Sequence, residues 1–464
     1  MTNVFFKRLC SRSNLFAAWR HVRSRALRSD SREIRNAAED FDFHAFRNIQ
    51  SIQSRLAAEN FIFPPADGIL KDKRKRESQG KLPRPLVLAD IRSRIVQRAL
   101  LQCLQPEADD ELSARIGRIA EINNSTVNFG CTPSGGVPRA LHRIVSLVNS
   151  DRNIFYKSDI GAFFTRVPHE HVLRFVFEQV GDSQFIEAFR NGLNVQLRNA
   201  AELGEYLSLF PDNEFGVAQG SSLSAFAGNV FLNEIDSKYR DTNGTALVRY
   251  VDDVILLGAS NEDLQRTKSN FTKDLRRLGL SLYDPGAAPD KASEGHVRAG
   301  IEYLGCLVRQ NHIEPSKKAR ASLLAKVDKK IYEAKETIGR FRANPNSVRN
   351  NEPTFAMTVT EIDRTTRGWA NSFRFINNRL IFNQIDREIF KKVVEFRHWL
   401  NQQNFADDNV SGRVLGVYQT KDVEHKPLEE FLLPRGKKAP LPLVVPSRQR
   451  PKILPKPTLT LKAS

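Results

Sequence analysis

The 464-residue sequence is poor in cysteine, and it contains no apolar run of about 18 residues that could span a bilayer. Its four cysteines, Cys10, Cys103, Cys131 and Cys306, lie far apart and form no pair with metal-ligand spacing. This usage predicts a cytoplasmic protein whose cysteines are in the reduced thiol form and serve in packing. Residues 1–25 are interrupted by charge and lack the apolar core of a secretory signal, so we expect no membrane partner.

Acidic residues are also in deficit. The chain has 53 Asp and Glu against 71 Lys and Arg, which gives a formal net charge of +18. Such an excess predicts a polyanionic partner, and nucleic acid is the first candidate. Residues 434–464 combine seven prolines and eight Lys or Arg with no acidic residue, a composition typical of an extended or disordered tail.

The rest of the chain has enough apolar content for two or three domains. Residues 1 to 60 have a basic helical pattern, and residues 71–84 form a charged stretch that we expect to be a loop. Apolar residues at helical spacing predict an amphipathic helix over residues 91–105. Strand-like and helical patterns alternate between residues 150 and 310, and two long charged helices are expected beyond them.

Three aspartates carry the chemistry that the sequence suggests. Asp252 and Asp253 lie between two apolar strand-like runs in R-Y-V-D-D-V-I-L-L-G, a pattern that by itself indicates an ordinary turn. Asp159 lies near the end of the apolar strand I-F-Y-K-S-D-I-G, where an acid needs a cation if it is buried. Carboxylates are the ligands that Mg²⁺ prefers, and two such ions about 3.5–4 Å apart can support phosphoryl transfer.

A small-residue segment lies between these acids, over residues 216–236. It begins G-V-A-Q-G-S-S and continues with apolar residues at helical spacing. Gln219 and Gly220 would allow close approach of the backbone to a nucleotide or a template strand. A simple loop and helix cap is the alternative interpretation.

The order of these segments resembles the consecutive palm motifs of reverse transcriptases: D-I-G-A-F-F, then A-Q-G-S-S-L-S, then Y-V-D-D. Upstream, G-K-L-P-R-P-L with I-R-S-R-I-V-Q-R-A-L, and then F-G-C-T-P-S-G-G, resemble fingers motifs. Downstream, I-E-Y-L-G-C-L resembles the Leu-Gly primer-grip hairpin, and R-G-W-A-N-S-F resembles a thumb segment of group II intron-like enzymes. The resemblance covers residues 70–375.

The resemblance implies an α+β right-hand polymerase with fingers, a ferredoxin-like palm with an antiparallel sheet, and a helical thumb. The expected divisions are, in chain order, a basic helical N-terminal extension (1–60), fingers (61–150), palm with part of the fingers inserted (151–310), helical thumb (311–400) and a C-terminal extension with the basic tail (401–464).

The resemblance also implies roles for site residues. Asp159 and Asp252 would be the main ligands of two Mg²⁺ ions, or of Mn²⁺ in their place. The backbone carbonyl of Ile160 would join them, and Asp253 would be an accessory ligand. All three aspartates are thus expected to be catalytic.

Further residues are expected to contact the nucleotide. Phe164 falls at the position of a steric gate against the ribose 2′-hydroxyl, with core packing as the alternative. Arg84 and Lys81 would hold phosphates, and Gln219 and Gly220 would contact nucleotide and template. Lys291 in P-D-K-A-S matches the lysine that follows the palm motifs, with a solvated surface lysine as the alternative.

The resemblance implies an RNA-directed DNA polymerase that uses dNTPs and has RNA and a DNA product as partners. No nuclease module, Cys-rich module or Val-Thr-Gly thumb motif is found, which favours a stand-alone bacterial enzyme that copies a dedicated noncoding RNA in antiphage defence. A template-independent or protein-primed deoxynucleotide polymerase of the same fold is the first alternative. A catalytically silent RNA-binding protein is the second. The sequence does not decide whether the chain forms a homo-oligomer.

Overall fold

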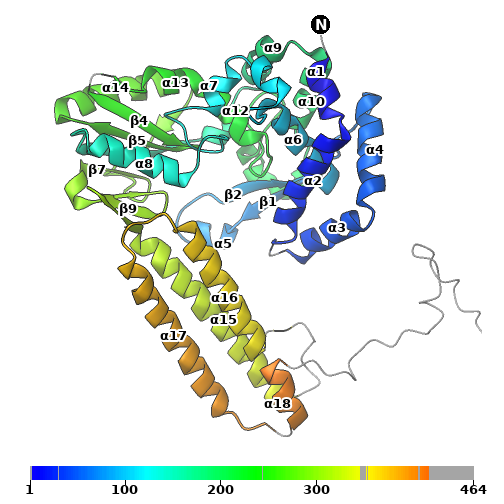
Figure 1. Ribbon diagram of the computed structural model, residues 1–464, viewed down its shortest axis with the longest axis vertical. Helices are drawn as coiled ribbons and strands as arrows, with labels where there is room; N and C mark the ends of the chain where they lie inside the picture. Colours follow the sequence, from blue (N-terminus) through cyan, green and yellow to red (C-terminus); the bar gives the residue numbers. More distant parts are fainter. Residues whose placement is uncertain are drawn as a thin grey trace, which may run out of the picture. The chain divides into compact units, whose positions relative to one another are not determined.

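The computed structural model describes residues 3–29, 31–242, 244–344, 352, 354–405 and 408–416 (Figure 1). The tail expected over residues 434–464 lies outside the described residues. The described part forms two compact units, one made of residues 3–326 and 365–391 and the other of residues from 327 to 364 and from 392 to 416. Within these residues, no helix combines the length and the apolar character that a membrane span needs.

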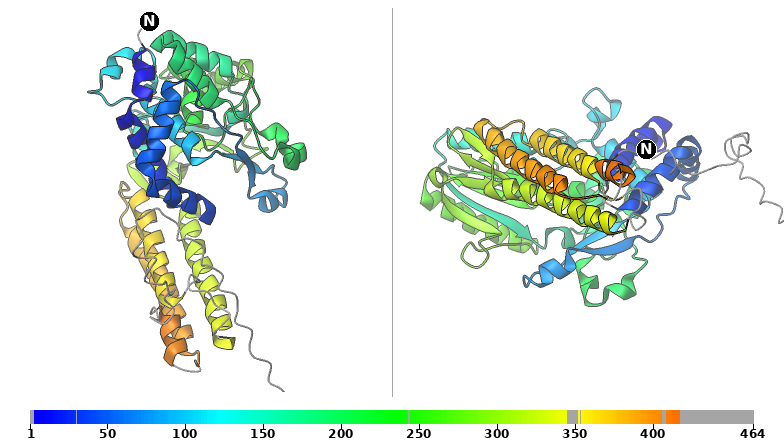
Figure 2. Two further views of the ribbon diagram at one scale, coloured as in Figure 1. Left: turned by 90° about the vertical axis from the view of Figure 1, so that its right-hand side faces the viewer. Right: turned by 90° about the horizontal axis from the view of Figure 1, so that it is seen from below.

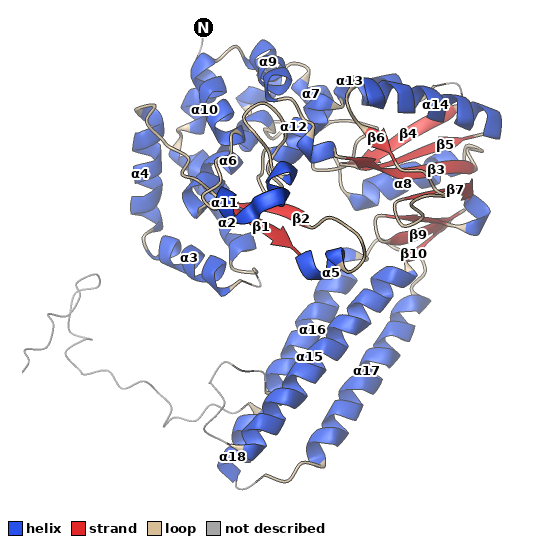
Figure 3. Ribbon diagram, turned by 180° about the vertical axis from the view of Figure 1, so that it is seen from behind, coloured by secondary structure: helices blue, strands red, loops and turns tan. Residues whose placement is uncertain are grey.

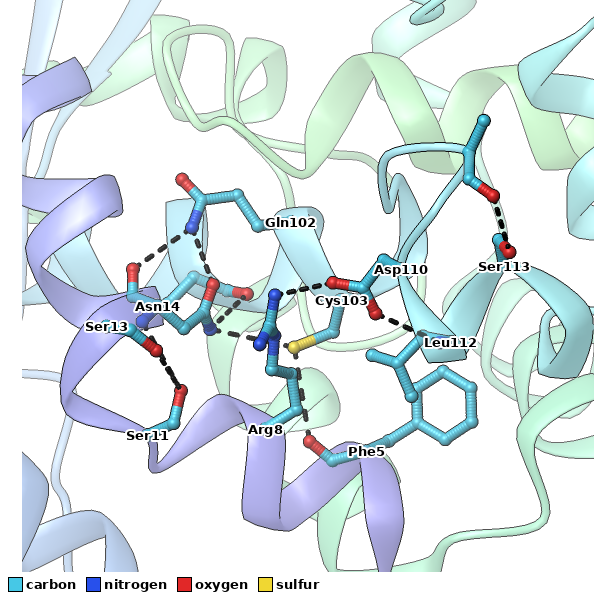
Figure 4. Close-up of polar contacts among 12 residues, drawn as sticks. Phe5, Arg8, Ser11, Ser13, Asn14, Gln102, Cys103, Asp110, Leu112 and Ser113 are labelled. Carbon is cyan, nitrogen blue, oxygen red and sulfur yellow. Dashed lines mark hydrogen bonds and ion pairs between the residues drawn. The ribbon is translucent and has the colours of Figure 1, made fainter.

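The described residues up to position 57 form helices α1 (Val4–Leu9), α2 (Arg12–Ala26), α3 (Arg32–Phe43) and α4 (Ala45–Ala57). Ser11 caps α2 by accepting a hydrogen bond from the Asn14 backbone, as serine does at a helix N-terminus. Helices α1 and α2 lie against α6 (Ile91–Leu104), which confirms the amphipathic helix expected over residues 91–105. Figure 4 shows the polar contacts of this interface, in which Asn14 Nδ2 donates to the Ala99 carbonyl at 3.2 Å and Gln102 Nε2 donates to Asn14 Oδ1 at 2.6 Å.

The first unit contains further helices. They are α5 (Lys73–Glu77), α7 (Ile119–Asn123), α8 (Val137–Val148), α9 (His169–Val180), α10 (Ser183–Leu193), α11 (Ala200–Leu203), α12 (Ser224–Phe231), α13 (Asn233–Lys238) and α14 (Asn261–Arg277). Short 3₁₀ turns include η2 (Phe163–Thr165). The charged stretch over residues 71–84, expected to be a loop, contains α5 and runs between two strands.

The largest sheet is antiparallel and contains the strands of the acidic motifs (Figure 3). Its order is β4-β5-β3-β6, and β7 also pairs with β3. The bounds are β3 (Ile154–Gly161), β4 (Thr245–Tyr250), β5 (Asp253–Gly258), β6 (Ser281–Leu282) and β7 (Ala292–His296). Smaller sheets are β1 (Asp67–Lys71) with β2 (Arg84–Leu88), and β8 (Ile301–Tyr303), β9 (Cys306–Arg309) and β10 (His312–Pro315) in the order β10-β9-β8.

The large sheet is buried on both faces, because alternate residues of its strands enter two different apolar clusters. Leu247 and Leu256 join a cluster that includes α14, whereas Val248 and Ile255 join one that includes α8 and strands β8 and β9. Burial on both faces explains why β4 and β5 are nearly continuous apolar runs rather than alternating ones. The α+β class expected from the sequence is confirmed.

Three long helices extend from the first unit into the second: α15 (Lys317–Ala343), α16 (Phe355–Ser372) and α17 (Leu380–Asn401). The second unit also contains α18 (Asp408–Leu415). Within that unit the helices run alongside one another (Figure 2), and Lys392 pairs with Asp328 at 2.6 Å. The rings of Phe355 and Phe396 pack there with their centroids 5.2 Å apart.

Candidate active site

The central strands bring the three aspartates together. Antiparallel pairing of β3 with β5 places Asp159 directly opposite Asp253. The backbone N–H of Ile160 donates to the Asp252 carbonyl at 2.7 Å, so the turn between β4 and β5 is attached to β3. Residues far apart in the sequence thus meet at one end of the sheet.

The turn that carries the acids has an unusual backbone. Val251 has φ +61°, in the left-handed region that a β-branched residue rarely adopts. Gly130 packs against it so closely that an added Cβ would lie 2.3 Å from the Val251 nitrogen. The segment around Gly130 also pairs with the end of β4, because Phe129 N–H donates to the Arg249 carbonyl at 2.9 Å. Gly130, the first glycine of F-G-C-T-P-S-G-G, is therefore required by this close approach.

A buried ion pair lies behind the turn. The Arg249 side chain has no exposed area, and its Nε donates to Asp236 Oδ1 at 2.7 Å. Its Nη1 also donates to the Val251 carbonyl at 2.8 Å and to Asn229 Oδ1 at 3.2 Å. Asn229 in turn donates to the Gly130 carbonyl at 3.0 Å. The sequence interpretation did not assign a role to Arg249 or Asp236; a cation beside apolar strand residues was the only signal for this pair.

The carboxyl groups lie close together, and two of them are largely buried. Burial raises the pKa of Asp252, and the neighbouring Asp159 adds to the effect. Burial, followed by the hydrogen bond and charge of Asp159, raises the pKa of Asp253 to about 7. Buried acids that lie this close together are a favourable environment for a divalent cation.

Lys291 is brought to the same place. Its Nζ donates to Asp159 Oδ2, and its backbone carbonyl accepts from the Asp159 N–H at 3.1 Å. Burial lowers the pKa of Lys291, but the hydrogen bond and charge of Asp159 outweigh burial, so the pKa is raised overall. The structure therefore places Lys291 at the acids rather than on an isolated surface.

A cavity of about 170 Å³ opens beside these groups. Its lining residues come from β3, the 3₁₀ turn after it, the loop before α12, the acidic turn and the segment between β6 and β7: Asp159, Ile160, Ala162, Phe163, Phe164, Thr165, Gln219, Asp252, Tyr283 and Lys291. Phe163 is only 2% exposed and packs against Gly228, whereas Phe164 is half-buried. Of the two rings, Phe164 is thus the one with surface to offer a ligand in this cavity.

The loop with Gln219 and Gly220 lies against β2. The Val87 N–H donates to the Gln219 carbonyl at 3.0 Å, and Gly220 has φ +118° with its Cβ position 3.0 Å from the Val87 carbonyl. Strand β2 begins at Arg84. Burial raises the pKa of Asp252, and the positive charge of Arg84 offsets a small part of that rise. Lys81 is partly exposed and pairs with Asp290 at 2.5 Å, next to Lys291.

The donor set fits a hard divalent cation, because it consists of carboxylates and a nearby backbone carbonyl, all oxygen ligands. Among the described residues, no three His, Cys, Asp or Glu side chains have the arrangement of a formed metal site. Asp159 and Asp252 both line the cavity with Ile160, whereas Asp253 contacts Asp159 from outside the lining.

The sequence of this chain is similar to sequences of known proteins. Residues 72–308 match the family model described as reverse transcriptase (RNA-dependent DNA polymerase). An uncharacterized 91 kDa protein in the cob intron of Schizosaccharomyces pombe is 28% identical over 188 residues, which is 40% of this chain and 20% of that protein. Protein YkfC of Escherichia coli is 29% identical over 194 residues, 40% of this chain and 44% of that protein.

A solved structure of telomerase from Candida albicans, in complex with a fragment of telomeric RNA, is 11% identical with a TM-score of 0.37. The alignment covers 77% of this chain and 64% of that chain. The present chain spans less than half the length of either curated relative that it matches.

Proposed function

Because the chain belongs to the reverse transcriptase (RNA-dependent DNA polymerase) family, we propose that it is an RNA-directed DNA polymerase whose reaction takes place at Asp159, Asp252 and Asp253. The α+β fold is consistent with the right-hand polymerase expected for that family. The observation that carries the proposal is the register of β3 against β5, which sets Asp159 opposite Asp253 while Asp252 faces the same cavity as Asp159.

The residues suit a site for two divalent cations. Asp159 and Asp252 would be the main ligands, with the Ile160 carbonyl beside them and Asp253 as an accessory ligand. Bound Mg²⁺, or Mn²⁺ in its place, would activate a primer 3′-hydroxyl and stabilise the leaving pyrophosphate. The chain's own contribution is to hold the acids in register through backbone hydrogen bonds between the strands, which keeps their geometry fixed.

Other residues at the cavity would bind and select the nucleotide. Arg84, Lys81 and Lys291 provide positive charge for its phosphates, in the charge-assisted contacts that guanidinium and ammonium groups make. Gln219 and Gly220 would contact nucleotide and template. The half-buried ring of Phe164 would crowd a ribose 2′-hydroxyl and so favour deoxynucleotides.

We assign the reaction to a polymerase organised as fingers (61–150), palm (151–310) and helical thumb (311–400), with an N-terminal helical extension (1–60) and a C-terminal extension (401–464). The net charge of +18 supports RNA and the DNA product as its partners. We place this enzyme in the bacterial cytoplasm, where it would copy a dedicated noncoding RNA in antiphage defence.

The chemistry is tested by primer extension on a defined RNA template with dNTPs and Mg²⁺. The wild-type protein should make DNA complementary to the template, and Asp252→Asn should abolish synthesis, because it removes a ligand charge with little change in volume. Asp241→Asn is the matched control, since Asp241 is half exposed and pairs with Arg152 away from the acids. Wild-type synthesis by Asp252→Asn would refute the assignment.

The template is tested by sequencing RNA that copurifies with the protein from cells that carry its native flanking DNA. A single enriched noncoding RNA, with a DNA product complementary to part of it, is the expected result. A DNA product without a complement in any bound RNA would support untemplated or protein-primed synthesis instead. A random RNA sample would contradict a dedicated partner, and bound RNA without DNA synthesis would support a silent RNA-binding protein.

A further inference from the structure

Three consecutive carbonyl groups of the acid-bearing turn each accept a hydrogen bond from a different element. The Val251 carbonyl accepts from Arg249 Nη1 at 2.8 Å, and the Asp252 carbonyl accepts from the Ile160 N–H at 2.7 Å. The Asp253 carbonyl accepts from the Tyr303 hydroxyl at 3.0 Å. Only the middle bond belongs to the main chain; the outer two depend on side chains from β4 and β8.

Both side-chain donors are buried. The Arg249 side chain is 0% exposed and the residue Tyr303 is 2% exposed. Hydrogen bonds in such surroundings are strong, and a partner left without its bond is costly. Arg249 is itself held by Asp236 and Asn229, and the Tyr303 ring packs in the cluster that contains β8, β9 and α8. Neither donor can therefore turn away to solvent at low cost.

Fixing this backbone matters because of the strain at Val251. A β-branched residue with φ +61° tends to relax toward the β or α region unless neighbouring contacts prevent it. Relaxation would rotate the following peptide units, which carry the Asp252 and Asp253 side chains. The bonds from Arg249 and Tyr303 oppose that rotation on either side of the Asp252 carbonyl.

We infer that Arg249 and Tyr303 are positioning residues, which hold the backbone of residues 251–253 so that Asp252 and Asp253 keep their register with Asp159. The catalytic part of this inference rests on the proposed polymerase activity; the structural part does not. Tyr303 thereby connects the three-stranded β8–β10 sheet to the acidic turn through a single hydroxyl.

The test is Tyr303→Phe, which removes one hydroxyl and keeps the ring. Tyr239→Phe is the matched control: Tyr239 is 3% exposed, and its hydroxyl donates to Asp274 Oδ2 at 2.6 Å, away from the turn. Because that bond is to a carboxylate, the control variant loses a hydrogen bond at least as strong as the one that Tyr303→Phe loses. Arg249→Lys is the second variant, because lysine keeps the charge but lacks the forked donors that reach Asp236 and Val251 together.

Two readouts are measured on the full-length protein. Amide hydrogen exchange should become about tenfold faster in peptides that cover residues 249–254 and Ile160 in Tyr303→Phe and Arg249→Lys, and should stay unchanged there in Tyr239→Phe. The kcat for dNTP incorporation should fall about tenfold in the two turn variants, with KM for dNTP changed by less than about twofold.

Equal exchange and equal kcat in Tyr303→Phe and Tyr239→Phe would overturn the inference, as would faster exchange at the turn with unchanged kcat. If the wild-type protein incorporates no dNTP, the proposed function fails. Hydrogen exchange then still decides whether Arg249 and Tyr303 hold the turn.

Discussion

The buried Arg249–Asp236 pair allows a prediction whose size follows from the structure. The two side chains are 0% and 8% exposed and are joined by bonds of 2.7 and 2.5 Å. In Arg249→Met the Asp236 carboxyl stays buried without its cation, a change that typically costs about 3–5 kcal/mol. Because whole-domain stabilities are about 5–15 kcal/mol, this single substitution should remove a large fraction of the stability of the first unit.

A second substitution distinguishes the loss of the ion-pair attraction from the cost of leaving the Asp236 carboxylate buried without a partner. Asp236→Leu in the Arg249→Met background removes the uncompensated carboxyl and fills the site with apolar atoms. Replacement of a whole buried pair by apolar residues is often neutral or stabilising. The double variant should therefore be more stable than Arg249→Met alone, although the bonds from Arg249 to Asn229 and Val251 remain lost.

The pH dependence of the single variant has a definite sign. Burial already raises the pKa of Asp236, and the Arg249 charge opposes the rise. Without Arg249 the folded-state pKa should rise further above its unfolded value of about 4. An acidic group whose pKa is raised in the folded state does not destabilise the protein at a pH below its unfolded-state pKa. It destabilises the folded state increasingly as the pH rises from that value toward the folded-state pKa. The deficit of Arg249→Met should thus shrink from pH 7.5 to pH 5, by up to about 1.4 kcal/mol per pH unit.

The measurement is urea unfolding followed by circular dichroism, at pH 5 and pH 7.5, for wild type, the single variant and the double variant. The dependence of the unfolding free energy on urea concentration must be the same for the three proteins before their unfolding free energies are compared. A deficit that does not change with pH, or a double variant no more stable than Arg249→Met, would refute the reasoning.

The remaining predictions concern other parts of the chain. Phe164→Ala should raise ribonucleotide use relative to deoxynucleotide use by about tenfold in single-nucleotide incorporation, because it opens space for a 2′-hydroxyl; an unchanged ratio would exclude Phe164 as the gate. Gly130→Ala should lower the free energy of unfolding by about 1–3 kcal/mol in a urea titration, since its Cβ would lie 2.3 Å from the Val251 nitrogen. Gly339→Ala, in a helix with no atom near its Cβ position, is the control and should not destabilise. Deletion of residues 434–464 should reduce the salt dependence of RNA affinity, and an unchanged slope in a binding titration would show that the tail makes no phosphate contacts.

Local patterns in the sequence predict the elements well. The apolar runs around Asp252 and Asp253 predict the β4–β5 hairpin, and helical spacing predicts α6 to within a residue. The charge of residues 71–84, with a Gly and a Pro near their end, predicts a loop, yet the stretch contains the five-residue helix α5 with no buried side chain. Such a short exposed helix leaves no apolar pattern to detect.

Contacts between distant segments could not be predicted in the same way. The partners Arg249 and Asp236 are 13 residues apart, Tyr303 and Asp253 are 50 apart, and Lys291 and Asp159 are 132 apart. A periodic pattern indicates which side of an element is buried, but not which remote element covers it. The resemblance placed the three aspartates in one site, whereas the donors that hold their backbone became visible only with the strand register and packing.

The topology of the large sheet also has a consequence for biosynthesis. Strand β3 leaves the ribosome well before β5 and β7, which pair with its two edges, and before Tyr303, which completes the bonds of the turn. Strands that are far apart in the sequence pair slowly. Until they pair, an unpaired apolar strand is prone to aggregation. A nascent chain arrested before residue 292 would leave one edge of β3 unpaired over residues 154–158, so we expect these intermediates to need chaperone protection until β7 emerges.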